Sequence, residues 1–250
     1  MEEYTDFALL YDEFMEDTPY DEWCVFICDK LKSHGINDGL VCDLGSGTGE
    51  MAVRLKEKGY DMIGIDNSES MLAIARSKED STDILYLLQD MREMELYGTV
   101  RAIVSVCDSI NYITDFDDLV HVFTLCNNYL DPEGLLIFDF NTRFKYEEVI
   151  GDDTIAETRE DASFIWENTF DPDTSLNEYD ITFFTKEESG LYRRFTETHI
   201  QRGYTLSEIK DALKKAGMIF EAAYDDYGNE PAGEESERIT VIARECGKKA

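Results

Sequence analysis

One stretch, Val41 to Glu50, constrains the fold of this chain more than any other part of the sequence. It opens with residues typical of the end of a buried strand, and Gly45, Gly47 and Gly49 then form a turn with almost no side-chain bulk. From Glu50 onward, apolar residues recur at helical spacing. A strand, a glycine turn and a helix in this order allow backbone N–H groups to approach a ligand closely.

A second acid after this turn indicates a nucleoside ligand. Asp66 ends the next predicted strand, where one carboxylate can accept hydrogen bonds from both ribose hydroxyls. Dinucleotide-binding turns have the pattern G-x-G-x-x-G, but here Glu50 takes the place of the third glycine and would repel a pyrophosphate. Asp43, before the first glycine, adds a further acid. The pattern therefore favours a cationic nucleoside without phosphate, such as S-adenosylmethionine.

Strand and helix patterns alternate on both sides of this turn, which predicts a doubly wound, Rossmann-like α/β fold. Two N-terminal helices are expected first, at 1–18 and 20–33. The core strands are predicted at 41–44, 62–66, 84–89, 102–107, 135–140, 219–224 and 239–243. The core helices are predicted at 49–58, 68–76, 115–129 and 206–216.

The pattern changes to short alternating strands in the second half of the chain. Three strands joined by turn residues are expected at 164–170, 179–184 and 192–199. Such short links imply antiparallel pairing, which a parallel core cannot absorb. We therefore predict an N-terminal helical cap at 1–35, a core at 36–150 and 202–250, and an inserted antiparallel β lid at 151–201.

The motifs between Asp43 and Asn141 resemble those of the class I S-adenosylmethionine-dependent methyltransferases, in which an acid precedes x-G-x-G-x-G. An N-terminal Tyr-Asp segment often covers the cofactor in that family, and Tyr11-Asp12 matches it. The resemblance implies that S-adenosylmethionine is bound by Tyr11, Asp43, Gly45, Ser46, Gly47, Gly49, Asp66, Asn67, Asp90, Met91 and Asp108. Taken singly, Asp90 and Asp108 could equally be helix caps.

A narrower likeness covers nearly the whole chain. The segments Pro19 to Trp23 and Glu197 to Arg202 are similar to those of uncharacterised bacterial small-molecule methyltransferases, and the inserted sheet is similar to that of sugar-nucleotide N-methyltransferases. The resemblance implies a transferase that moves a methyl group by in-line displacement to a small molecule, with an amine favoured. No Asn-Pro-Pro-Tyr signature of nucleic-acid amino methylation follows the fourth core strand.

The charge of the chain argues against polyanionic partners. A net charge of −32 and a pI near 4.2 disfavour nucleic acid and anionic membrane surfaces. The six cysteines are scattered without metal-ligand spacing, so no metal is expected, and free thiols suit a reducing cytoplasm. Neither a signal peptide nor a membrane-spanning apolar run is evident. The oligomeric state is left open.

His199 is the candidate catalytic base. On a strand it shares one face with Arg193, Phe195, Glu197 and Gln201, a mixture that could line a pocket. The competing interpretation is an edge strand in water. Three aromatic residues of the insertion are expected to give the acceptor an apolar wall: Trp166, Phe184 and Tyr192.

Two other functional classes compete with this one. A nicotinamide oxidoreductase would use the same strand–turn–helix arrangement, but Glu50 disfavours it. A non-catalytic S-adenosylmethionine-binding sensor or scaffold protein would carry the same nucleoside motifs. The motifs leave open the identity of the acceptor, the atom methylated and the use of a general base.

Overall fold

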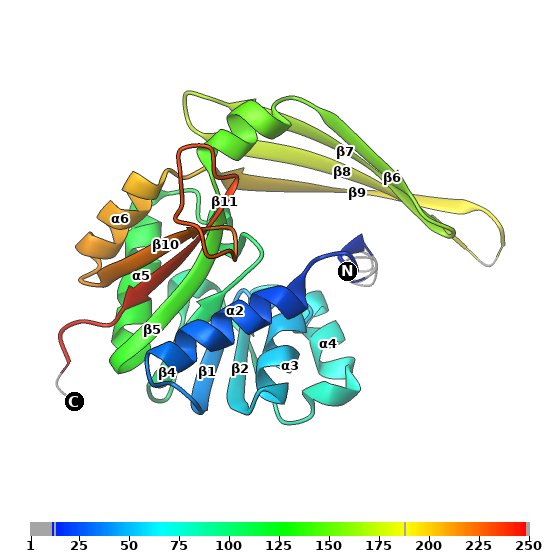
Figure 1. Cartoon of the computed structure of the whole chain (residues 1–250). Helices are drawn as coiled ribbons and strands as arrows, with labels where there is room; N and C mark the ends of the chain where they lie inside the picture. The colour runs from blue at the N-terminus through cyan, green and yellow to red at the C-terminus, as the bar shows by residue number, and fades with distance from the viewer. Residues whose placement is uncertain (1–11, 13, 188, 249–250) are drawn as a thin grey trace.

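A computed structural model of the chain describes residues 12, 14–187 and 189–248. Two sheets organise this part of the molecule (Figure 1). The larger has seven strands in the order β10-β11-β5-β4-β1-β2-β3, and the smaller has four in the order β6-β7-β8-β9. The predicted N-terminal helix lies mostly outside the described residues.

The seven-stranded sheet is the predicted Rossmann-like core. Its parallel strands are β1 (Gly39–Leu44), β2 (Tyr60–Asp66), β3 (Leu85–Leu88), β4 (Val100–Ser105) and β5 (Leu130–Asn141). Two antiparallel strands, β10 (Ile219–Asp225) and β11 (Arg238–Arg244), complete it beside β5. The strand order reverses between β1 and β4, which is where ligands bind in open α/β sheets.

Helices cover both faces of this sheet, each with its own hydrophobic cluster. One face carries α2 (Tyr20–Ser33), α3 (Glu50–Glu57) and α4 (Glu69–Ser77). The other carries α5 (Phe116–Tyr129) and α6 (Leu206–Lys215). Side-chain caps start three of these helices: Ser68 at α4, Asp115 at α5, and a capping box of Thr205 and Glu208 at α6.

Two strand ends differ from the sequence-based expectation. β5 begins at Leu130 rather than at the expected Leu135, because Glu133 adopts a left-handed φ of 64° and the register with β4 shifts there, so that the strand continues through a bulge. In contrast, β4 ends at Ser105, before the expected Cys107, which begins a tight turn instead.

The antiparallel sheet has four strands rather than the three expected. They are β6 (Thr154–Thr158), β7 (Ala162–Asp171), β8 (Leu176–Lys186) and β9 (Tyr192–Arg202). The sequence did not reveal β6 because its side chains are almost all exposed, so no apolar alternation marks it. The π-helix η4 (Lys145–Ile150) leads into this sheet, which rises over the carboxyl ends of the core strands (Figure 1). The predicted division into cap, core and lid stays a prediction.

Candidate functional site

A cavity of about 1580 Å³ lies between the carboxyl ends of the core strands and the antiparallel sheet. This exceeds the roughly 300–1,000 Å³ of a typical small-molecule pocket, so there is room for two ligands. Most of the predicted site residues line it: Asp43, Gly45, Ser46, Gly47, Asp66, Asn67, Asp90, Met91, Asp108 and His199. Gly49 does not line it, and Tyr11 lies outside the described residues.

The glycine turn uses its three glycines differently. Gly45 has φ +79°, and a Cβ there would lie 2.6 Å from the Ser109 Oγ. Gly47 has φ +51° with open space around it, so its backbone is presented to the cavity. Gly49 precedes α3 with φ +82°, and a Cβ there would collide with the Tyr86 ring. Gly49 thus does not line the cavity, and its positive φ and the nearby Tyr86 of β3 are what require glycine there, while its role in binding the cofactor stays a prediction.

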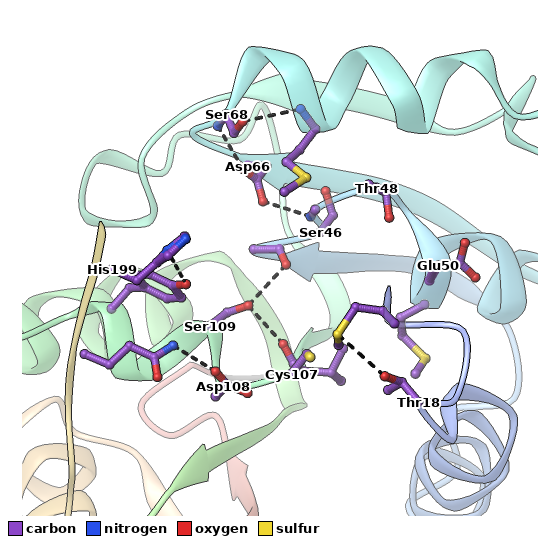
Figure 2. A pocket seen from close by; sticks show the side chains of 18 of the residues that line it. Thr18, Ser46, Thr48, Glu50, Asp66, Ser68, Cys107, Asp108, Ser109 and His199 are labelled. Atoms are coloured by element: carbon purple, nitrogen blue, oxygen red, sulfur yellow. Dashed lines mark hydrogen bonds between the residues drawn. The ribbon is translucent and has the colours of Figure 1, made fainter. Parts of the chain in front are cut away.

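Asp66 joins the end of β2 to the glycine turn. Its carboxylate accepts hydrogen bonds from the backbone N–H of Gly47 at 2.8 Å and of Ser68 at 2.8 Å. Burial raises the pKa of Asp66, while these two bonds oppose the rise. Each carboxylate oxygen has two lone pairs, so both can still accept a ribose hydroxyl. Figure 2 shows Asp66 beside Ser46 at one side of the cavity.

Asp43 is a buried carboxylate whose environment calls for a cationic ligand. Neither oxygen has a hydrogen-bond partner of normal geometry among the described residues, and the same holds for the buried Ser46 hydroxyl. Burial, with a smaller contribution from nearby Asp66, raises the pKa of Asp43 to about 7. A cation or hydrogen-bond donor in the cavity would relieve this penalty. The residues at this end of the cavity therefore fit the positively charged S-adenosylmethionine.

We expect Asp43→Asn to stabilise the ligand-free protein at pH 8. Because the folded-state pKa lies above the unfolded value, the charged carboxylate is destabilising above pH 7, and this penalty disappears as the pH falls toward 4. The gain should approach an upper bound of roughly 4 kcal/mol at pH 8 and vanish near pH 4. Urea unfolding at both pH values measures it, with the exposed Asp61→Asn as control. Equal stability of the Asp43 variant and wild type at pH 8 would contradict this account.

Glu50 lines the cavity, but its charge is largely compensated. It forms ion pairs with Arg54, one helical turn away, and with Lys78 at the end of α4. These two cations lower the pKa of Glu50 and offset the effect of its burial. The expected repulsion of a pyrophosphate by Glu50 is therefore weaker than the sequence indicated, because both partners are contributed by the folded helices.

The described part of the N-terminal segment bridges the glycine turn and the antiparallel sheet. Asp12 accepts a hydrogen bond from the Thr48 hydroxyl at 2.5 Å and pairs with Lys78 at 2.9 Å. Phe14 packs edge-on against Phe164 of β7, with ring centroids 4.9 Å apart. The segment leading into α2 thus reaches up toward the antiparallel sheet along one side of the cavity (Figure 1).

The two acids with competing interpretations differ in the structure. Asp90 caps the 3-10 helix η2 (Met91–Glu93), accepting from the Arg92 N–H at 2.9 Å, and the Arg92 guanidinium lowers its pKa. Asp108 also precedes a 3-10 helix, but its side chain makes no capping hydrogen bond there. Its carboxylate accepts from the Gln201 side chain at 2.8 Å and from the Arg238 guanidinium at 3.1 Å. Asp108 therefore links the core to the antiparallel sheet.

His199 of β9 lines the cavity from a different wall than Asp66 at the end of β2 (Figure 2). β9 is an edge strand, but the face that carries His199 is covered, and its side chain is only 16% exposed. Its Nδ1 lies 3.0 Å from the Tyr112 hydroxyl, and its Nε2 lies 3.9 Å from the Glu197 carboxylate. Burial lowers the pKa of His199 below 6.5, with Asp108 opposing in part, so the imidazole is neutral at pH 7. The edge-in-water interpretation is therefore wrong for this face.

An aromatic wall lies beside His199, but the prediction of its residues is wrong at two of three positions. Trp166 lines the cavity as predicted, whereas Phe184 and Tyr192 do not. Tyr179 pairs directly with His199 across β8 and β9, so residues of even number on these two strands point to the opposite face. Tyr179, stacked on His199 at 5.5 Å, takes their place. The sequence did not show which residue of β8 lies opposite His199, so it could not show which aromatic rings share its face.

The described residues include neither a metal-ligand cluster nor a membrane-spanning helix. No group of three or more His, Cys, Asp or Glu side chains there could hold a metal ion. No helix in the same part of the chain is long and apolar enough to cross a membrane.

Known proteins resemble this chain in sequence and in structure. Residues 41–134 match a family described as a methyltransferase domain. The Bacillus subtilis (strain 168) protein named "Putative methyltransferase YqeM" is 39% identical over 96% of both chains. A crystal structure of an S-adenosylmethionine-dependent methyltransferase from Clostridium acetobutylicum ATCC 824 is 30% identical, with a TM-score of 0.88 over 98% of this chain and 99% of that one.

A more distant likeness is of fold alone. CalS10, an amino pentose methyltransferase from Micromonospora echinaspora whose structure was solved with S-adenosylmethionine bound, is 17% identical to this chain. The TM-score is 0.74, over 92% of this chain and 93% of that one.

Proposed function

Because this chain belongs to the S-adenosylmethionine-dependent methyltransferases, we propose that it methylates a small-molecule amine in the cavity between its two sheets. S-adenosylmethionine is its cofactor. Membership of this family favours a methyltransferase over the two competing classes, a nicotinamide oxidoreductase and a non-catalytic sensor. The observation that carries the proposal is a cavity with room for two ligands and with two chemically different ends. Acids and backbone N–H groups form one end, and aromatic rings with a neutral histidine form the other.

The cofactor belongs at the end formed by the glycine turn. When bound, S-adenosylmethionine supplies a methyl group on a sulfonium that is already activated for in-line displacement. Asp66 would accept hydrogen bonds from the ribose hydroxyls, and Gly47 would offer its open backbone to the methionine part. Asn67, Asp90 and Met91 would hold the adenine, and Asp43 would supply negative charge for a cationic ligand.

The acceptor belongs at the end formed by the antiparallel sheet. An amine must lose its proton before it can attack, and His199, neutral at pH 7, can take that proton on Nε2. Its Nδ1–H then donates to the Tyr112 oxygen, and the Glu197 carboxylate stabilises the imidazolium that forms. Trp166 and Tyr179 exclude water. A carboxylate in this wall favours an amine over an anionic acceptor.

The proposal is tested with methyl-labelled S-adenosylmethionine and a panel of amines. The panel pairs amino sugars, amino acids and polyamines with the hydroxyl analogue of each. We expect label to appear on at least one amine and not on its hydroxyl analogue, because the neutral base serves an ammonium better than an alcohol. Label found only on hydroxyl or carboxylate compounds would contradict the amine assignment while leaving methyl transfer intact.

We also expect the N-terminal segment to slow cofactor release. Phe14→Ala removes the aromatic contact with β7, worth about 1–1.5 kcal/mol, and should speed release of S-adenosylmethionine roughly tenfold. Stopped-flow tryptophan fluorescence measures the rate. Leu191→Ala, at the exposed tip between β8 and β9, is the control. If both variants release the cofactor at the wild-type rate, the segment packs on the cavity without gating it.

A further inference from the structure

The turn that follows β4 has a strained backbone. Cys107 and Asp108 adopt φ angles of 59° and 54°, so two consecutive non-glycine residues lie in the left-handed region. Such a conformation is costly for each residue and persists only where surrounding groups enforce it. The turn lies in the cavity wall, where β4 ends beside the strand-order reversal.

Asp139 of β5 supplies that enforcement. Its side chain is fully buried, and its two oxygens accept from the Cys107 N–H at 2.9 Å and the Asp108 N–H at 2.6 Å. The Tyr227 hydroxyl donates to it at 2.6 Å and the Arg238 guanidinium at 3.0 Å. Oδ2 accepts three of these four hydrogen bonds and Oδ1 accepts the one from Asp108, so both oxygens of the buried carboxylate have partners.

The Cys107–Asp108 turn itself positions groups at both ends of the cavity. Asp108 receives the Gln201 side chain of β9, which ties the antiparallel sheet to the core. The 3-10 helix η3 (Ser109–Tyr112) starts directly after the turn and ends at Tyr112, the partner of His199. The Ser109 hydroxyl donates to the Gly45 carbonyl at 3.2 Å, which connects the same helix to the glycine turn.

We infer that Asp139 is a positioning residue, which holds the Cys107–Asp108 turn in its left-handed form and thereby fixes Tyr112 against His199. The inference rests on the proposed function for the role of His199. The clamp, by which we mean the hydrogen bonds from the Cys107 and Asp108 N–H groups to Asp139, does not depend on that function. Asp139 does not line the cavity, so it acts through the groups that donate to it, which include the turn and Arg238.

Hydrogen exchange of the full-length wild-type protein is the first test. The amides of Cys107 and Asp108 lie outside any strand, yet they donate to a buried carboxylate. We expect both to exchange as slowly as amides in the middle of β4. Exchange at the rate of an exposed loop would overturn the inference without any variant.

Asp139→Asn gives the second test. An amide presents one acceptor oxygen and a donor, so one turn N–H loses its acceptor, and exchange there should become about 10- to 100-fold faster. The imidazole NMR signals of His199 should move at the same time, and the chain has only three histidines to assign. Unchanged exchange and unchanged His199 signals would overturn the inference.

Thr240→Val is a matched control. Thr240 pairs directly with Asp139 across β11 and β5, is equally buried, and its hydroxyl has no hydrogen-bond partner among the described residues. We expect this variant to leave both readouts at their wild-type values. A Thr240→Val variant that reproduces both effects would reduce Asp139 to a packing residue.

A glycine at position 107 separates positioning from simple charge pairing. Glycine adopts a positive φ without cost, so Cys107→Gly in the Asp139→Asn background should return the His199 signals toward wild type. If Asp139 served only as a counter-charge for Arg238, glycine at position 107 could not restore the His199 signals. Failure of this rescue would therefore overturn the inference. None of these readouts requires methyl transfer, so a negative amine assay leaves them standing, and the reverse holds.

Discussion

Replacing His199 with alanine is expected to lower the turnover number on an amine acceptor by about 10²-fold, the usual contribution of a general base. Cofactor affinity should stay unchanged, because His199 lines the cavity from a different wall than Asp66. The pH profile should change as well. Burial lowers the pKa of His199, so wild-type turnover should rise with pH along an acidic limb that lies below the range of an ordinary histidine.

The matched control is His121→Ala, which removes an exposed histidine of α5. Initial rates with the identified amine and equilibrium binding of S-adenosylmethionine give the two quantities separately. In the His199 variant the acidic limb of the profile should disappear together with the rate. A variant that keeps full turnover, or that keeps the same acidic limb, would show that His199 only packs against Tyr112 and Tyr179.

Asp66→Ala is expected to weaken S-adenosylmethionine binding by about 1.5–3 kcal/mol, or roughly 10- to 100-fold. Two effects add here. The ribose loses its charged acceptor, and Gly47 loses the bond that holds the glycine turn to the end of β2. Isothermal titration calorimetry measures the change.

Asp61→Ala is the control, because Asp61 lies on the same strand with an exposed side chain. Far-ultraviolet circular dichroism verifies that both variants fold. Wild-type affinity in a folded Asp66 variant would remove Asp66 from the cofactor site. NADH should not bind the wild-type protein at comparable strength, since the carboxylates of Asp43 and Asp66 at this end of the cavity disfavour a negatively charged pyrophosphate.

The sequence by itself determined the fold class, the family and the position of the cofactor motif. These features are local: the glycine turn, the apolar runs of β1 and β4, and the capping box at Thr205 each depend on neighbouring residues. Alternation along β9 likewise showed which side chains share a face with His199. Local periodicity follows from backbone geometry, so it can be seen without the fold.

Only the tertiary structure decided which distant residues meet. Pairing of β1 with β2 brings Asp66 to the Gly47 N–H, and the register of β8 with β9 places Tyr179, not Phe184, beside His199. The clamp on the strained turn needs β4 and β5 to be neighbours, which puts Asp139 under Cys107. Such contacts depend on strand order and register, and a shift of one residue turns every side chain to the other face. Although each of these pairings joins consecutive strands, alternation along one strand does not say which residue of its neighbour lies opposite.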